Sequence, residues 1–389
     1  MSTRTSIASE RPVPDAFSGD RWFYPDVLAD DMRSSAIPSE KIPEALAVTW
    51  EYNRCVVPEY TNWDRYIALA RLGGIAIVAE YNGALLDVVN DPCPLGYDID
   101  EQLDILFGGT SMREPMGREY RASLLFMTEK ASNRRGSRLY QRYAEALAHS
   151  PADYFRIRDC DGMFRFYLNA AIACNDSENW LSEPEYRALM EVAATLYDSV
   201  AFHKHRAEGE ICNVFAYADP QLRQDAYRAN REVLWALDAN WSHRPDRRAA
   251  VQFCRFVGGP IHLMMRRYRF VEDGLMAGRP ETQAVIDEAR KNFKLWYRSD
   301  PRTAEDFEER YTQVMTLQDR LLFDGFAEML ERPDEEKCPD CIRKEFYGTA
   351  ELGEFSGVGL CPACRERWGD HLRTIADRAG AVLPLSPPR

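Results

Sequence analysis

Long apolar runs are missing from this chain, and so is any excess of positive charge. No stretch approaches the roughly 18 consecutive apolar residues of a membrane-spanning helix, and no apolar segment of the signal-peptide kind stands near its start. The 389 residues carry 62 acidic and 49 basic side chains, a formal net charge of -13 at pH 7. Nucleic acids and anionic membrane surfaces are bound by basic faces. We therefore expect a cytoplasmic protein with no nucleic-acid partner and no membrane span.

Strand-like alternation is also scarce, and there is neither an internal repeat nor a long low-complexity segment. From about residue 38 to residue 330, apolar residues recur at three- and four-residue spacing between turn signals such as "NDPCPLG" and "SHRPD". Segments such as "LARLGGIAIVAEYNGALL" are apolar almost all round, which is typical of helices inside a bundle. The pattern predicts an all-α bundle around an apolar cavity over residues 21–332, preceded by a disordered tail at residues 1–20.

The ten cysteines do not suggest a disulfide framework, because six are scattered and four form two close pairs. "CPDC" and "CPAC" make a CxxC-x19-CxxC array that can hold one Zn²⁺ with four thiolates: Cys338, Cys341, Cys361 and Cys364. Four cysteine ligands leave no open position, so the ion is expected to be structural. We predict a zinc module at residues 333–375 packed on the bundle, then a tail at residues 376–389.

The stretch "DSVAFHKHRAEGEICN" resembles the second metal-binding helix of class I terpene synthases. That helix reads N-D-x-x-S-x-x-K-E, often followed by x-x-x-G-D/E-x-x-N, and its Asn, Ser and Glu hold metal from one face. Asp198 and Lys204 match the pattern. The three ligand positions are taken by other residues: Tyr197, Ala201 and His205. This helix therefore has a weakened metal site or, alternatively, only structural ion pairs.

Two other stretches resemble segments that bind diphosphate in the same enzymes. "YFRIRDCDG" resembles a helix break in which an Arg is followed by an Asp and a Gly: Arg158, Asp161 and Gly162. "GGPIHLMMRRY" resembles their late Arg-Tyr pair. Arginine suits bidentate capture of phosphate oxygens and lysine adds a point charge, although each residue could instead be an ordinary surface group. The predicted diphosphate site comprises Arg158, Lys204, Arg267 and Tyr268.

Where an aspartate-rich motif is expected, the chain reads "IAIVAEYNG", with Glu80 as its lone carboxylate. A buried glutamate is costly unless it is paired or coordinated, so Glu80 is predicted to serve the metal or diphosphate site, with a structural ion pair as the alternative. The rival acidic cluster "YDIDEQLD" follows a turn and fits the acidic first turn of a helix. The candidate Mg²⁺ ligands are Glu80, Asp198, Glu208 and Glu210.

Taken together, these stretches closely resemble the fungal alpha-ionylideneethane synthases, sesquiterpene synthases of the abscisic-acid pathway, from about residue 20 to about residue 370. The resemblance implies conversion of farnesyl diphosphate into a cyclic hydrocarbon through neutral polyene intermediates. Such a route needs a group that removes a proton and returns it, and the candidates are His205, His203, Glu80 and the diphosphate itself. The predicted catalytic set is Glu80, His205, Asp161 and Gly162, assisted by Mg²⁺.

Two other classes of function remain open. The substitutions at the metal-ligand positions also fit a non-catalytic isoprenoid-binding or zinc-scaffolded interaction protein, although such a scaffold would not need the basic phosphate ligands. A zinc ribbon that binds nucleic acid is disfavoured by the acidic charge balance.

Overall fold

The computed structural model describes residues 22–132, 136–265, 307–343 and 354–385, and these are built from α-helices and short turns. The helices are α1 Ile42–Val56, α2 Trp63–Asn82, α3 Ile99–Phe107, α4 Arg113–Lys130, α5 Arg138–His149, α6 Pro151–Asp161, α7 Phe164–Ala173, α8 Glu183–Glu208, α9 Arg223–Trp241, α10 Pro245–Val257, α11 Ile261–Met264, α13 Phe307–Thr316, α14 Gln318–Leu321, α15 Phe326–Leu330, α16 Pro362–Arg373 and α17 Ile375–Val382. Within these ranges no strand forms, and the sheet-like pairing is a single antiparallel bridge between Ile342 and Gly359. The all-α prediction is confirmed.

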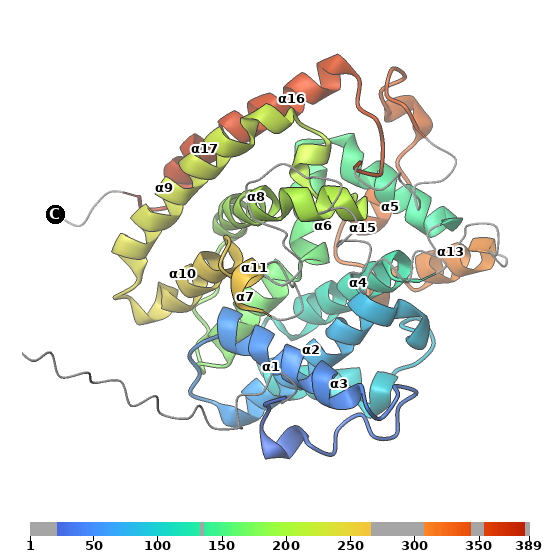
Figure 1. Ribbon diagram of the computed structural model, residues 1–389, viewed down its shortest axis with the longest axis vertical. Coiled ribbons are helices and arrows are strands. Elements are labelled where there is room, and N and C mark those ends of the chain that lie inside the picture. Colours follow the sequence, from blue (N-terminus) through green and yellow to red (C-terminus); the bar gives the residue numbers. More distant parts are fainter. Residues whose placement is uncertain (1–21, 133–135, 266–306, 344–353, 386–389) are drawn as a thin grey trace, which may run out of the picture.

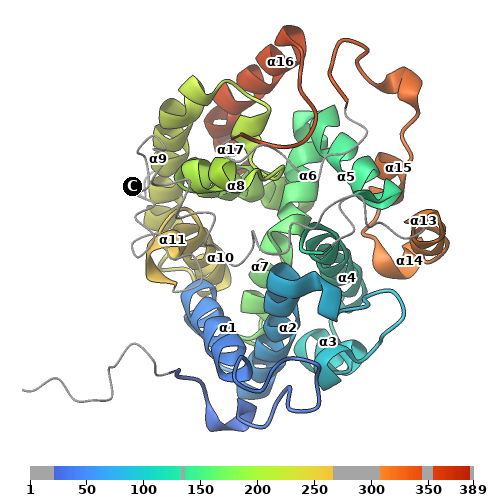
Figure 2. The same cartoon turned by 45° about the vertical axis from the view of Figure 1, so that its right-hand side comes forward.

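The helices form one bundle, and its two ends are built from different parts of the chain. Helices α1, α2 and α3 lie together at one end, whereas α9, α16 and α17 lie at the other (Figures 1 and 2). Helices α13 and α15 pack beside α5. None of the helices in the described ranges is both long and apolar enough to cross a membrane.

Helix α2 is the most deeply enclosed element on the N-terminal side. Its first turn is capped by Asn62, whose side chain accepts a hydrogen bond from the backbone N–H of Arg65 at 3.0 Å. From Tyr66 to Ala79 nearly every residue is buried, because α1, α3 and α4 all pack on this helix. The apolar sequence of α2 is explained by this burial on all sides.

Helix α8 begins and ends with strong local signals. Ser182 and Glu185 form a reciprocal capping box at its start. At its end Gly209 adopts a left-handed conformation with φ 63°, and the backbone N–H of Glu210 donates to the carbonyl of His205 at 2.9 Å. This turn directs the chain back toward the bundle, so Glu210 and Cys212 can line a pocket beside α8.

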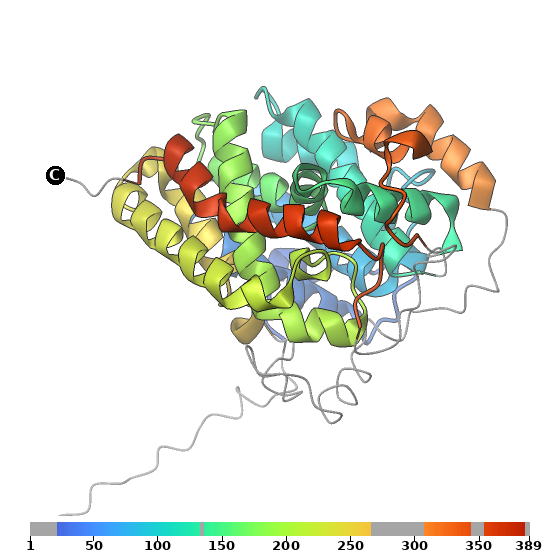
Figure 3. The same cartoon turned by 90° about the horizontal axis from the view of Figure 1, so that it is seen from above.

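The C-terminal segment packs across helices from the middle of the chain, as seen from above in Figure 3, where α16 and α17 are red. The predicted tail at residues 376–389 needs correction, because Ile375–Val382 form α17. Ile375 and Ala379 are buried where α17 packs on α8 and α9. Arg378 is also paired with Glu191 of α8. The predicted tail at residues 1–20 lies outside the described residues.

The acidic cluster at the start of α3 has the structural role that its sequence suggested. The side chain of Asp98 accepts hydrogen bonds from the backbone N–H groups of Asp100 and Glu101 at 2.9 and 3.1 Å. Asp98 is thus the N-cap of α3, and the helix-start prediction for this cluster is confirmed.

Candidate active site

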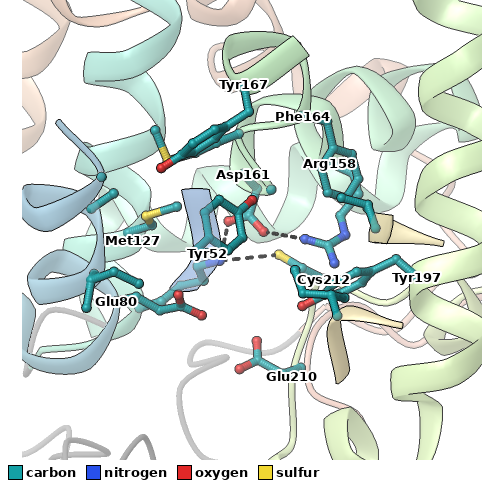
Figure 4. A pocket seen from close by; sticks show the side chains of 18 of the residues that line it. Tyr52, Glu80, Met127, Arg158, Asp161, Phe164, Tyr167, Tyr197, Glu210 and Cys212 are labelled. Atoms are coloured by element: carbon teal, nitrogen blue, oxygen red, sulfur yellow. Dashed lines mark hydrogen bonds and ion pairs between the residues drawn. The ribbon is translucent and has the colours of Figure 1, made fainter. Parts of the chain in front are cut away.

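A pocket lies among helices α1, α2, α4, α6, α7, α8, α10 and α11 and the loop after α8 (Figure 4). Its empty volume is about 1030 Å³, including the part that opens to solvent. Six of the residues predicted from the sequence line it: Glu80, Arg158, Asp161, Gly162, His205 and Glu210.

Part of the pocket wall is apolar and aromatic. The rings of Tyr52 and Tyr167 meet edge to face with centroids 4.7 Å apart, and those of Phe164 and Tyr197 are 6.0 Å apart. The apolar lining also includes Ala76, Ile77, Met127, Met163, Val257 and Ile261. Such a wall can hold an apolar chain, and its ring faces can stabilise a cation.

A helix break brings charged groups to this wall. Helix α6 ends at Asp161 and α7 begins at Phe164, with Met163 in a left-handed conformation between them (φ 54°). A Cβ on Gly162 would come within 2.8 Å of the Phe164 ring, so only glycine fits here without a shift of that ring. The break therefore places the end of α6 and the aromatic start of α7 side by side in the pocket.

Arg158 is held in the pocket by two carboxylates. Its terminal nitrogens donate to Asp161 and to Asp198, each at 2.9 Å, and its side chain is buried. The guanidinium also lies over the Tyr197 ring, 5.2 Å from the centroid. A guanidinium has five N–H donors, and these two contacts use only two of them. The remaining donors leave Arg158 able to bind an anion.

Asp198 is engaged inside the protein instead of facing the pocket. Besides Arg158, its carboxylate accepts hydrogen bonds from the Tyr154 hydroxyl at 2.7 Å and the Val214 backbone N–H at 2.8 Å. The residue is fully buried and is not among the described residues that line the pocket. Burial raises the pKa of Asp198, although Arg158 and Tyr154 favour its charged form. This geometry makes Asp198 a support for Arg158 and does not favour it as a Mg²⁺ ligand.

Lys130, at the end of α4, is a pocket cation that sequence reasoning missed. Its ammonium is paired with Asp161, which also accepts a hydrogen bond from the Tyr143 hydroxyl at 3.0 Å. Burial alone would raise the pKa of Asp161, but Lys130 and Arg158 outweigh burial and lower it. Burial opposes the charge of Lys130 too, yet Asp161 raises its pKa. No spacing in the sequence links Lys130 to the helix break, so the pairing of Lys130 with Asp161 is seen only in the folded structure.

His205 lies in the pocket in a fixed, neutral form. Its Nδ1 is 3.1 Å from Nδ2 of Asn213, whose Oδ1 accepts a hydrogen bond from the Phe215 backbone N–H. The Asn213 amide therefore donates to Nδ1, and the proton of the imidazole must be on Nε2. Burial lowers the pKa of His205 well below its ordinary value, although Glu210 opposes that shift. The lone pair that could accept a proton is engaged by Asn213.

Among the described residues, Glu80 and Glu210 are the two half-buried carboxylates that line the pocket. Glu80 is in the last turn of α2, and Glu210 follows the end of α8. Figure 4 shows both carboxylates directed toward the space between them, below Asp161. Carboxylate oxygens are preferred ligands of Mg²⁺, which needs only one or two of them when phosphate oxygens complete its coordination.

The remaining predicted site residues are not placed in the pocket. Lys204 is buried on α8 but is not among the described lining residues. The side chain of Glu208 and the whole of Arg267 and Tyr268 lie outside the part of the chain that the structure describes.

The four paired cysteines meet in space and could hold a metal ion such as zinc. Their sulfur atoms all lie within 4.8 Å of one another, and those of Cys338 and Cys361 are 3.8 Å apart. Four Zn–S bonds of about 2.3 Å in a tetrahedron place neighbouring sulfurs about 3.8 Å apart, so the spacing fits this ion. A backbone hydrogen bond from Cys364 lowers the pKa of Cys361 to about 7, which favours the thiolate that binds metal.

This cysteine cluster is joined to the pocket through packed side chains. Cys361 caps α16, whose buried Trp368 lies against Tyr154 with ring centroids 5.3 Å apart. Tyr154 in turn donates to Asp198, the support of Arg158. A second connection comes from the segment before Cys361, where the Ser356 backbone N–H donates to the carbonyl of Glu210 at 3.2 Å.

Comparison with known proteins identifies the family. The family model described as "Alpha-ionylideneethane synthase aba3" matches residues 20–385. An alpha-ionylideneethane synthase (abl3) from Leptosphaeria maculans is 46% identical over 368 residues, covering 94% of this chain and 86% of that protein. A second, aba3 from Botryotinia fuckeliana, is 46% identical over 94% of this chain and 83% of its own length. The chain therefore belongs to the alpha-ionylideneethane synthase family.

Proposed function

We propose that this protein is a sesquiterpene synthase that converts farnesyl diphosphate into a cyclic hydrocarbon of the alpha-ionylideneethane type and releases diphosphate. The observation that carries the proposal is a pocket whose lining combines aromatic rings with two cations, the buried Arg158 and the half-buried Lys130. A prenyl diphosphate has the matching character, since an apolar chain ends in a concentrated negative charge. The names of the relatives support the same reaction class.

The diphosphate would be bound by Arg158 and Lys130. Both cations are already positioned by carboxylates, so neither must reorganise when negative charge develops on the leaving group. The predicted contributions of Lys204, Arg267 and Tyr268 remain part of this proposal. Arg158 can offer its unused N–H donors to phosphate oxygens in a bidentate contact.

Mg²⁺ would be held by Glu80 and Glu210 together with the diphosphate. Their half-buried carboxylates fit a hard cation that retains several waters. The ion would add positive charge beside the leaving group. Asp198 is left out of this set because its oxygens already accept three hydrogen bonds.

The reaction would begin when the allylic C–O bond breaks and its electron pair leaves with the diphosphate. The resulting allyl cation loses a proton to give a neutral polyene, which is protonated again to start ring closure and then loses a final proton. The balance is one hydrocarbon and one proton, which ends on the diphosphate. Because the His205 lone pair is engaged by Asn213, we assign the proton transfers to diphosphate oxygens held by Arg158 and Lys130.

The test is incubation of purified protein with farnesyl diphosphate, with and without Mg²⁺, in H₂O and in D₂O. We expect a cyclic hydrocarbon by gas chromatography and mass spectrometry, stoichiometric diphosphate release, and deuterium in the product from reprotonation of the polyene. Tight binding of the substrate without hydrocarbon would instead establish a non-catalytic isoprenoid-binding protein. A product without deuterium, even at low enzyme concentration and long reaction time, would argue against a neutral intermediate that exchanges with solvent.

A further inference from the structure

One face of α2 runs along the pocket from its apolar end to its charged end. Four residues of this helix line the pocket: Gly73, Ala76, Ile77 and Glu80. Their spacing of three, four and seven residues places them on one helix face. At a rise of 1.5 Å per residue, Gly73 and Glu80 are about 10.5 Å apart along the helix axis. These four residues, here called the α2 strip, therefore follow the depth of the pocket, starting from the Glu80 carboxylate.

The deep end of this strip is closed by tyrosines. A Cβ on Gly73 would lie 2.7 Å from the Tyr167 hydroxyl and 3.0 Å from Cγ2 of Thr49. Tyr167 is buried and meets the ring of Tyr52, which also lines the pocket. In Figure 4, Tyr167 lies on the far side of the pocket from Glu80 and Glu210. The backbone of α2 thus forms part of the pocket floor only because residue 73 has no side chain.

Glycine inside a helix needs a reason, because it is the poorest helix former after proline. Gly73 lies in the middle of α2, and the close approach of Tyr167 supplies that reason. Its neighbour Gly74 has a different one, because a Cβ there would meet Cε of Met32 at 2.5 Å, away from the pocket lining. Comparing alanine substitutions at these two adjacent glycines therefore distinguishes an effect on the pocket from an effect on the helix.

We propose that Gly73, with Tyr167 and Tyr52, forms the floor that matches the pocket to the length of a farnesyl chain. This inference rests on the proposed function, since the charged end must hold the diphosphate. With the diphosphate beside Glu80, the chain extends along Ile77 and Ala76, and its last isoprene unit reaches Gly73. A shorter geranyl chain ends before the floor. A methyl group at position 73 should therefore weaken the binding of a farnesyl ligand and leave the binding of a geranyl ligand unchanged.

The test measures equilibrium binding of farnesyl and geranyl thiolodiphosphate, in which sulfur slows cleavage of the bond to the chain. Gly73→Ala is expected to weaken farnesyl binding about tenfold or more, the usual effect of one misplaced methyl group in an apolar pocket, and to change geranyl binding less than twofold. Gly74→Ala, which gains the same helix propensity, is expected to leave both affinities unchanged. Ala76→Leu, halfway along the strip, is expected to weaken both ligands.

A second variant protects the test against misfolding of α2. Tyr52→Trp extends the floor from α1 and is expected to reproduce the selective loss of farnesyl binding. Equal losses for both ligands in Gly73→Ala and Tyr52→Trp, or no loss in either, would overturn the floor assignment while leaving the proposed reaction intact. Failure of the wild-type protein to bind either thiolodiphosphate would overturn the proposed function itself.

Discussion

At the scale of single residues, Asp198 occupies a position beside the metal ligands in the terpene synthase motif that its helix resembles, yet its carboxylate is enclosed. Replacing it by Asn keeps the shape and leaves Arg158 with one carboxylate partner instead of two. Because breaking a buried ion pair costs about 3 to 5 kcal/mol, we expect Asp198→Asn to lower the free energy of unfolding by about 3 kcal/mol. Denaturant titration measures this change.

The same variant separates a supporting role from metal binding. If Asp198 only orients Arg158, turnover falls while the Mg²⁺ concentration for half-maximal activity stays constant. Asp225→Asn, at an exposed position of α9, is the matched control and should change neither quantity. Unchanged stability together with a higher Mg²⁺ concentration for half-maximal activity would return Asp198 to the set of metal ligands.

Unlike Asp198→Asn, substitutions of Glu80 and Glu210 should change the Mg²⁺ concentration for half-maximal activity. Glu80→Gln and Glu210→Gln each remove one hard anionic ligand while keeping the shape of the side chain. We expect each to raise the Mg²⁺ concentration for half-maximal activity by about tenfold or more, since the proposed Mg²⁺ site takes few of its ligands from the protein. Glu232→Gln on the exposed face of α9 serves as the control. Full activity of Glu80→Gln at low Mg²⁺ would make Glu80 a structural partner only.

His205 gives the protein an acid-sensitive position. Its native pKa lies well below the ordinary 6.5 because of burial, so the unfolded chain binds this proton more readily than the folded one. Its stabilising contribution is complete above about pH 6.5 and is lost as the pH falls toward the native pKa, with a slope of up to about 1.4 kcal/mol per pH unit.

The variant His205→Asn keeps an acceptor near the Nδ1 position and should flatten the dependence of unfolding free energy on pH below about 6.5. The exposed His243 provides the control His243→Asn, which should keep the wild-type slope. A slope that His205→Asn leaves unchanged would show that other groups cause the acid sensitivity.

At the scale of elements, sequence patterns predicted several features of the structure. The CxxC spacing predicted the sulfur cluster because each tight turn holds its two thiolates close together, and two such turns can share one metal ion. The four sulfurs do lie within 4.8 Å of one another. The resemblance of "YFRIRDCDG" to the helix break of class I terpene synthases predicted the break between α6 and α7. Helix α17 was missed because its 8 residues are too few for a local pattern to establish a helix. Its helix is stabilised by packing on α8 and α9, which no local pattern shows.

At the scale of the whole molecule, the pocket joins segments that are far apart in the chain. Lys130 of α4 meets Asp161 of α6, and Glu80 of α2 faces Glu210 after α8. The sequence predicted three of these four residues from separate motifs, but it could not predict their pairing or the presence of Lys130. Such pairings depend on helix packing, which brings side chains together without leaving a fixed spacing in the sequence.

The cysteine cluster connects the C-terminal segment to this pocket, and metal removal should therefore act at a distance. Cys361→Ser removes one of four ligands and frees the start of α16, which holds Trp368 against Tyr154. We expect loss of bound zinc, a decrease in Tm of about 5 °C or more, and weaker farnesyl thiolodiphosphate binding, because Tyr154 supports Asp198 and Arg158. Metal analysis, calorimetry and binding titration measure the three effects. Cys93→Ser, an exposed thiol outside the cluster, should change none of them. A zinc-free Cys361→Ser protein with normal Tm and normal ligand affinity would show that the metal site and the pocket are independent.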